Sequence, residues 1–222
     1  GIVGYESPVY FSKIEFVWEV EITEVAVPVG AAGISTFCSE YALDFSGQSD
    51  VTAWVATGVT KDNSVTLEQV QQVPAGVGVI VMAEEGGNYD VTVTSDATEP
   101  ETNFMVGVTK PEGEKITRYD DGTGNLNFVL LRNTNTNTVA FHNIAADYTH
   151  TVSAGKAYLS IPASFGAHVV PNAPLKLDVD GDEVTGIEAV NCEEVENGDA
   201  YNLQGIKVDS NYKGFVIKNG KK

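Results

Sequence analysis

The sequence predicts an all-β protein: a β-sandwich or barrel-like body from two similar halves, followed by a short C-terminal β-hairpin. Three observations carry this prediction. Apolar and polar residues alternate with a period of two along much of the chain, and clusters of Gly, Asn and Asp separate the alternating runs. A pattern of three strands also occurs twice. One weak helical signal, at residues 67–72, is contested by strand propensity.

The predicted strands begin with a long one at residues 9–22. In that run the apolar Ile14, Phe16 and Trp18 alternate with Lys13 and Glu15, which gives one buried face and one wet face. Further strands are predicted at residues 51–57, 64–70, 78–82, 89–94, 103–109, 126–132, 138–144, 156–161, 199–208 and 214–218. Turn clusters lie at residues 61–63, 85–88, 120–125 and 133–137.

The internal repeat relates residues 63–81 to residues 137–161. Each copy has a strand, a loop, a small-residue turn that ends in glycine (Gly76 or Gly155) and a strongly apolar strand, and a further strand precedes each copy. The repeat predicts that Ile80 and Leu159 are equivalent and buried. Neither half then needs to bury its apolar face alone, and a pseudo-twofold arrangement of the halves is compatible with the pattern.

Composition along the chain predicts four segments. Residues 1–24 form a leading strand that resembles the end of an upstream domain, and residues 25–175 form the body, with halves at about 25–98 and 99–175. Residues 176–198 read as an acidic linker, because nine acidic residues and no Lys or Arg occur between Asp178 and Asp199. Residues 199–222 form the terminal hairpin.

Net charge excludes some classes of partner. The chain carries 13 Lys and Arg against 31 Asp and Glu, a formal charge of −18. Nucleic acids and anionic membrane surfaces require clustered cations, so neither is an expected partner. The longest apolar stretch, residues 77–83, is far too short for a transmembrane segment.

A catalytic centre is not recognisable in the sequence. The spacing of Cys38 and Cys192 is not that of a metal site. Three interpretations of Cys38 remain: a buried small hydrophobic residue, a partner of Cys192 in a disulfide or, least favoured, a catalytic thiol. No HExxH, GxSxG or phosphate loop occurs. An enzyme would need at least two of these side chains in one cleft: His142, His150, Asp120, Asp121 and Cys38. For Asp120 and Asp121, the following Gly-Thr-Gly favours a plain turn.

One candidate metal site is present. Asp178, Asp180 and Asp182 alternate around Gly181, which suits oxygen coordination of Ca²⁺ at a tight turn. The position that supplies a bidentate Glu in an EF-hand loop is Ala189 here, so an acidic linker turn is the competing interpretation. No other cofactor is expected.

Aromatic residues offer a second kind of site. Exposed aromatics stack on sugars in many β-sandwich modules. The candidates are Trp18, Trp54, Tyr5, Tyr10, Tyr89, Tyr119, Tyr148 and Tyr212. The two tryptophans alternate with apolar neighbours, which favours core positions for both.

The end of the chain resembles a known kind of tail. Residues 201–222, YNLQGIKV followed by KGFVIKNGKK, are similar to the "YNLxGxxV…KGxYIxNGKK" ending of secreted and surface proteins of Bacteroidetes, with a mild departure at Phe215. Upstream, TGIEAV at 185–190, ALDFSG at 42–47 and AGKAYLSIPA at 154–163 resemble the linker and the β-rich modules that precede such tails. The resemblance implies an accessory module of an exported protein, extracellular or at the cell surface, whose tail sorts or anchors it. It implies no catalytic residues.

Three functions follow as hypotheses. The first is a noncatalytic accessory or structural module of an exported protein, in contact with an upstream domain of the same polypeptide. The second is an adhesin-like module that binds carbohydrate or a surface protein. The third is an enzyme with an unrecognised active site.

Overall fold

The computed structural model describes residues 21–120, 122–169, 173–179, 182–184, 200–202, 207–208 and 216–218. Their only helical element is the 3₁₀ helix η1 (Ala163–His168). The strands are β1 (Glu24–Val29), β2 (Ile34–Phe37), β3 (Leu43–Asp44), β4 (Val51–Val59), β5 (Ser64–Val70), β6 (Gln72–Val73), β7 (Val79–Ala83), β8 (Gly87–Val93), β9 (Met105–Val108), β10 (Glu114–Ile116), β11 (Leu126–Arg132), β12 (Val139–Asn143), β13 (His150–Val152), β14 (Lys156–Ile161), β15 (Lys176–Val179), β16 (Asp182–Val184), β17 (Ala200–Asn202), β18 (Lys207–Val208) and β19 (Val216–Lys218).

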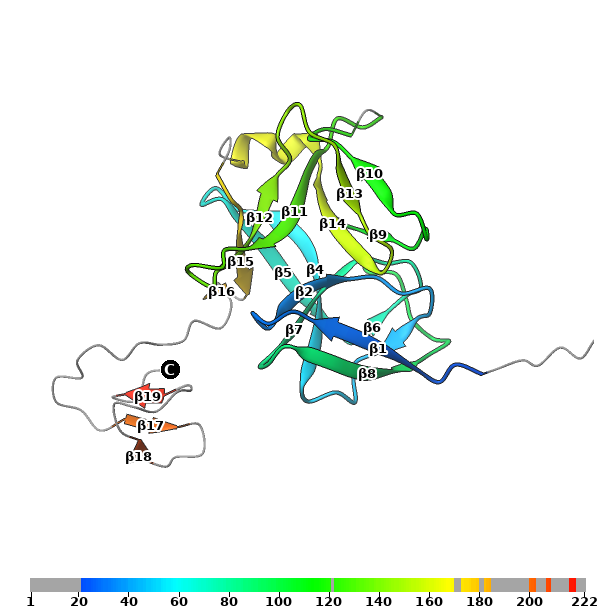
Figure 1. Cartoon of the computed structure of the whole chain (residues 1–222), viewed down its shortest axis with the longest axis vertical. Helices are drawn as coiled ribbons and strands as arrows, with labels where there is room; N and C mark the ends of the chain where they lie inside the picture. Colours follow the sequence, from blue (N-terminus) through cyan, green and yellow to red (C-terminus); the bar gives the residue numbers. More distant parts are fainter. Residues whose placement is uncertain are drawn as a thin grey trace, which may run out of the picture.

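The all-β fold class is confirmed, and the strands form curled sheets in a sandwich-like or half-barrel-like body (Figure 1). The largest sheet has the order β16-β15-β5-β4-β7-β2, and a four-stranded sheet has the order β12-β11-β14-β9. Smaller sheets are β1-β8-β3-β6, β10-β13 and β18-β17-β19. The segment with weak helical character lies in β5 and β6.

The two halves share one topology. In the first, β4 pairs with β5 and β7, β7 pairs with β2, and β3 pairs with β6. In the second, β11 pairs with β12 and β14, β14 pairs with β9, and β10 pairs with β13. All eight pairings are antiparallel. Six strands of each half therefore correspond in chain order and in partner, and the correspondence includes strands outside the repeated sequence.

Backbone details repeat as well. Within the described residues, the non-glycine residues with positive φ are Asn63 (62°) and Asn137 (58°), which occupy the same place before β5 and β12. Asparagine tolerates this left-handed conformation better than most residues. Gly76 and Gly155 also have positive φ, and their N–H groups donate to the carbonyls of Ser39 (2.7 Å) and Val108 (2.8 Å), which are equivalent positions.

The halves share one of the three hydrophobic clusters, which is called the shared core below; the second cluster lies wholly within the first half and the third wholly within the second. A single cluster of buried residues includes Ile34 and Ile80 from the first half and Phe128 and Leu159 from the second. Ile80 and Leu159 are both fully buried, as the repeat predicts. The Cys38 N–H also donates to the Gly155 carbonyl across the boundary at 3.1 Å. Figure 1 shows the first half, blue to green, lying directly against the second, green to yellow.

Equivalent positions face each other where the halves meet. The register pairs Ile80 with Thr36 and Leu159 with Met105, so Cys38 corresponds to Gly107. A Cβ placed on Gly107 would lie 2.5 Å from the Cys38 sulfur. Likewise, a Cβ on Gly78 would lie 2.8 Å from the Cβ of Ala157, its counterpart. These contacts are those expected at a pseudo-twofold axis.

The segment predicted as an acidic linker needs a correction at its start. Residues 176–179 and 182–184 are strands: β15 pairs in parallel with β5 and antiparallel with β16. The physical reason is the continued alternation of Leu175, Leu177 and Val179, of which both leucines are fully buried. The body therefore extends past residue 175. Residues 185–198 lie outside the described residues.

The two ends of the chain differ in detail from the prediction. Residues 1–20, with most of the predicted leading strand, lie outside the described residues, and the first described strand is β1. In the tail, β17 pairs antiparallel with both β18 and β19, so three short strands replace the predicted two. Gly205, a turn-favouring residue, separates β17 from β18 in the sequence.

Candidate functional site

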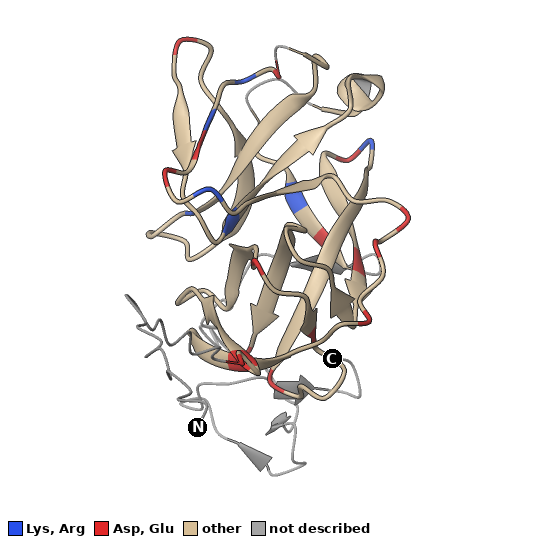
Figure 2. Cartoon of the chain, turned by 90° about the vertical axis from the view of Figure 1, so that its right-hand side faces the viewer, with Lys and Arg blue, Asp and Glu red and all other residues tan. Residues whose placement is uncertain are grey.

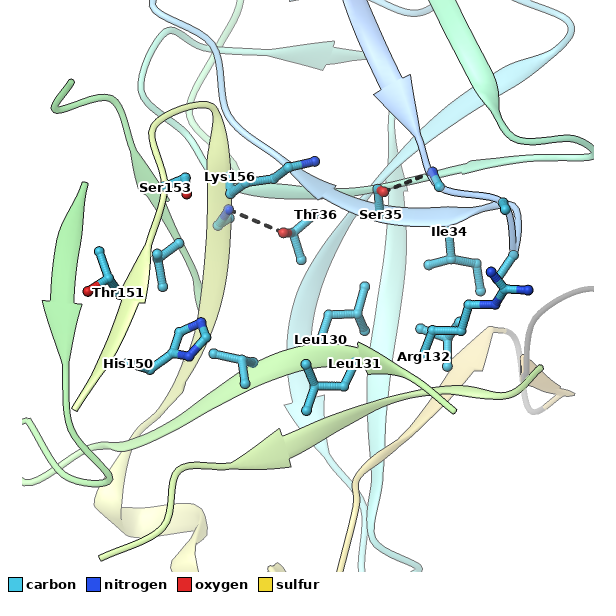
Figure 3. A pocket seen from close by; sticks show the side chains of 17 residues that line it. Ile34, Ser35, Thr36, Leu130, Leu131, Arg132, His150, Thr151, Ser153 and Lys156 are labelled. Atoms are coloured by element: carbon cyan, nitrogen blue, oxygen red, sulfur yellow. Dashed lines mark hydrogen bonds between the residues drawn. The ribbon is translucent and has the colours of Figure 1, made fainter. Parts of the chain in front are cut away.

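A cleft of about 370 Å³ lies between the two halves. One wall comes from residues 30–36, which are β2 and the turn before it. The other comes from residues 129–132 of β11, Val139 of β12, residues 150–153 in β13 and just after it, and residues 156–157 of β14. Figure 3 shows Arg132 and His150 toward opposite ends of this cleft, with Thr36 and Leu130 between them and Lys156 above Thr36 in this view. The volume falls within the usual range of small-ligand pockets.

The chemistry of the cleft contrasts with that of the whole molecule. Figure 2 shows acidic residues spread over the outer loops. By contrast, the described residues that line the cleft include no Asp, Glu or Cys. They present three basic side chains (Arg132, His150 and Lys156), four hydroxyls (Ser35, Thr36, Thr151 and Ser153) and an apolar remainder.

Lys156 owes its position to the Gly155 turn. Gly155, at φ 76°, ends the turn, and Lys156 is the first residue of β14. Its side chain is half-buried, and this burial lowers the pKa of its ammonium group. No carboxylate of the described residues forms an ion pair with it. The equivalent residue in the first half is Val77, so the cation is a departure from the internal symmetry.

Arg132 and His150 stand at the ends of their strands. Arg132 ends β11, and its Nε donates a hydrogen bond of 2.7 Å to Asn137 Oδ1 in the turn that leads to β12. His150 begins β13, and the exposed Tyr148 ring lies 6.3 Å from it between ring centroids. Tyr148 is 58% exposed, so the His150 end of the cleft carries an accessible aromatic surface.

Hydrogen bonds hold the wall formed by residues 30–36. The Ala157 N–H of the second half donates to the Thr36 hydroxyl at 3.3 Å, and the Gly30 N–H donates to the Ser35 hydroxyl at 3.0 Å. Each hydroxyl oxygen accepts a bond in this arrangement, and its own O–H remains a donor for a ligand. The wall is thus fixed before any ligand arrives.

The candidate catalytic residues do not converge among the described residues. Only His150 lines the cleft; His142 lies on β12, where its backbone pairs with Val129. Cys38 is buried, and burial is the main cause that raises the pKa of its thiol to about 11, against a reactive thiolate. Cys192 lies outside the described residues.

Asp120 has the turn role that the sequence favoured. Its carboxylate accepts hydrogen bonds from the Thr123 N–H (2.7 Å), the Thr123 hydroxyl (2.9 Å) and the Gly122 N–H (2.9 Å). These bonds, that of the Thr123 N–H first, lower the pKa of Asp120. Asp121 lies outside the described residues.

The predicted calcium site is only partly described. Asp178 lies on β15 opposite Glu183, Asp182 lies on β16 opposite Val179, and Asp180 lies outside the described residues. Among the described residues, no three metal-ligating side chains come together. Asp178 Oδ1 is buried without a hydrogen-bond partner there. Calcium binding by Asp178, Asp180 and Asp182 stays a prediction.

The predicted aromatic candidates are scattered. Trp54 is half-buried against the shared core, and its indole N–H donates to the Thr52 hydroxyl at 2.8 Å. Tyr119 is exposed beneath the Arg118 guanidinium, and Tyr89 donates its hydroxyl to the Glu85 carbonyl. Tyr148 is the candidate beside the cleft. Trp18, Tyr5, Tyr10 and Tyr212 lie outside the described residues.

Sequence reasoning missed Lys156 and Arg132. Arg132 belongs to no motif, and Lys156 lies in AGKAYLSIPA (154–163), which served only for the resemblance; the three basic side chains also come from three different strands. A signal for Lys156 was nonetheless present, because aligning the two copies of the repeat sets it opposite Val77.

Comparison of the chain with protein-family models, curated proteins and solved structures found no match. Among the described residues, no helix has the length and apolar character needed to span a bilayer.

Proposed function

We propose that this chain is a noncatalytic accessory module of an exported protein, extracellular or at the cell surface, and that it binds a ligand in the cleft between its halves. The observation that carries the proposal is the composition of this cleft. Its described lining offers cations, hydroxyls and apolar surface, which suit recognition of a ligand.

The same lining is poorly suited to catalysis by side chains. Nucleophilic and general acid–base mechanisms need a nucleophile and a base within hydrogen-bond reach of each other. No thiol or carboxylate of the described residues lines the cleft, and none of their hydrogen bonds joins a lining hydroxyl to His150 or Lys156. The sequence offered Cys38 and Asp120 as alternatives. Cys38 is buried, and the Asp120 carboxylate accepts the hydrogen bonds of its own turn.

Export is supported by the tail. Residues 201–222 resemble the tails of secreted and surface proteins of Bacteroidetes, and TGIEAV precedes them. A duplicated β-body with a shared core also suits a module that joins an upstream domain of the same polypeptide. Such a module needs rigidity and a binding surface rather than a reaction centre.

An activity screen tests the noncatalytic assignment. The whole chain is incubated with panels of glycan, ester and peptide substrates, beside His150→Ala and its matched control His142→Ala, since His142 lies on β12 and does not line the cleft. We expect all three proteins to show only background turnover. Turnover that His150→Ala abolishes and His142→Ala retains would identify an enzyme and overturn the proposal.

A further inference from the structure

We infer that the cleft between the halves binds an acidic oligosaccharide, whose carboxylates contact Lys156 and Arg132. The inference rests on the proposed binding function and adds the class of ligand. Three features of the described residues carry it: the charge of the cleft, the covered edge of β2, and the mixture of hydroxyl and apolar groups around the cations.

The distribution of charge favours an anionic ligand. Residues 25–98 contain one Lys and nine acids, whereas residues 99–175 contain five Lys and Arg and seven acids. Two of these five cations line the cleft, together with His150. In a chain of charge −18, an anion is repelled by most of the surface and attracted at this cleft.

Lys156 is costly unless it meets an anion. A half-buried ammonium group without a partner destabilises a folded protein, because water solvates it better than the protein does. No carboxylate of the described residues pairs with Lys156, and the equivalent Val77 shows that the fold accepts an apolar residue at this position. A ligand carboxylate supplies the missing partner.

Arg132 is placed to hold a second carboxylate of the same chain. Its Nε bond to Asn137 fixes the guanidinium at one end of the cleft, and the terminal N–H groups can form a fork for a carboxylate. Figure 3 shows this group well separated from Lys156. The separation suits a ligand that carries one carboxylate on each of several units.

The edge of β2 disfavours a peptide that would add as a further strand. β2 is the last strand of its sheet, but β14 lies against this edge. The Ala157 N–H bonds to the Thr36 hydroxyl, and the Cys38 N–H bonds to the Gly155 carbonyl. Strand addition needs a continuous free edge, which residues 36–38 do not offer.

Sugar chemistry matches the remaining surface. Ser35, Thr151 and Ser153 present hydroxyls for hydrogen bonds to sugar hydroxyls. Leu131, 47% exposed, and Tyr148 present apolar surface for the C–H faces of the rings. An acidic oligosaccharide combines these groups with carboxylates at regular intervals.

Calorimetric titration of the whole chain tests the inference. The probes are trimers of galacturonic acid and of mannuronic acid, a neutral galactose trimer, a hexaglutamate peptide and inorganic phosphate. We expect at least one acidic trimer to bind, and the neutral trimer, the peptide and phosphate to bind at least tenfold more weakly. Added salt should lower the affinity for the acidic trimer.

Substitutions locate the site. Lys156→Gln and Arg132→Gln are each expected to lower the affinity for the acidic trimer at least tenfold. Lys61→Gln makes the same change of charge on an exposed turn of the first half and should leave this affinity unchanged. Because burial lowers the pKa of Lys156, Lys156→Gln is expected to melt no lower than the parent, which separates loss of binding from loss of fold.

Several results would overturn the inference. The first is that neither acidic trimer binds. The second is that the neutral trimer, the peptide or phosphate binds as tightly as the acidic trimer. The third is that Lys61→Gln weakens binding of the acidic trimer as much as Lys156→Gln does. None of them requires turnover in the activity screen, so the noncatalytic assignment can stand when this inference fails. Turnover dependent on His150 would instead remove the proposed function.

Discussion

Gly107 and Cys38 show how closely the two halves approach each other. They are equivalent positions on opposite sides of the boundary, and a Cβ on Gly107 would meet both the Cys38 sulfur and the Gly76 carbonyl oxygen. Gly107 lies on β9, where its backbone pairs with Ala157. The absence of a side chain at Gly107 is therefore a condition for the contact between the halves.

Gly107→Ala is expected to destabilise the protein by about 1–3 kcal/mol, because the new methyl group overpacks a boundary made partly of backbone. Gly47→Ala is the matched control, since a Cβ at Gly47 has no neighbour within 4 Å. Urea unfolding of both variants measures the difference. Equal midpoints for Gly107→Ala and Gly47→Ala would mean that the boundary is looser than described.

Cys38 and Tyr158 make the protein sensitive to alkaline conditions. Burial is the main cause that raises the pKa of Cys38 from 9.0 to about 11 and that of Tyr158 from 10.0 to about 12. For a raised pKa, the folded state keeps the proton that the unfolded state loses. Stability is therefore complete below the unfolded pKa and falls as pH rises to the folded pKa.

The Cys38 part of this effect is separable by substitution. Between pH 9.0 and about 11 the thiol should cost about 2–3 kcal/mol of stability, at 1.36 kcal/mol for each pKa unit. The difference in unfolding free energy between Cys38→Ala and the parent should therefore shift in favour of the variant by this amount. A constant difference across that range would show that the thiol ionises equally well in the folded protein.

At the scale of elements, strands with strong alternation of apolar and polar residues were predictable, and strands in which that alternation is weak were missed. Residues 126–132 and 156–161 match β11 and β14 at both ends, because apolar runs there lie between clear turns. β2 was missed: it has four residues, and Ser35 and Thr36 interrupt its apolar character. β15 was missed because its acidic surroundings suggested a solvated linker.

β15 provides a test of that correction. Leu177 is fully buried in the shared core, so Leu177→Ala should cost about 2–5 kcal/mol through the cavity left behind. Leu131→Ala removes the same atoms from a residue that is 47% exposed and should cost much less. Urea unfolding compares the two. A cost for Leu177→Ala no larger than that for Leu131→Ala would return β15 to the status of a linker.

The candidate site was less predictable than the fold, for a geometric reason. A sheet-forming pattern is local in sequence, whereas Arg132, His150 and Lys156 come from three strands whose meeting depends on the packing of the halves. Of these three, the sequence singled out His150 alone. The repeat offers partial help, because functional residues are expected where its copies differ, as Lys156 and Val77 do.

At the scale of the whole molecule, duplication explains both the stability of the body and the place of its cleft. Two copies of one six-stranded topology meet about a pseudo-twofold axis and bury the shared core between them, while each copy also has a buried cluster of its own. The boundary between similar units is a common place for ligand pockets. The two copies differ there, for example at Lys156, whose equivalent in the first half is Val77. Such differences give one site rather than two.

The shared core leads to the last prediction: neither half should fold alone. Ile34 and Ile80 lose Phe128 and Leu159 when the halves are separated, and β5 loses its partner β15. Residues 21–98 and 99–184, produced separately, should each lack a cooperative urea transition, and mixing them should restore one. Each half keeps a buried cluster of its own, but separation exposes the shared cluster, and the burial that remains should not offset the conformational entropy of a half. A cooperative transition in either isolated half would show that the duplicated unit is itself a domain, and the cleft would then be an interface between two domains rather than a feature of one body.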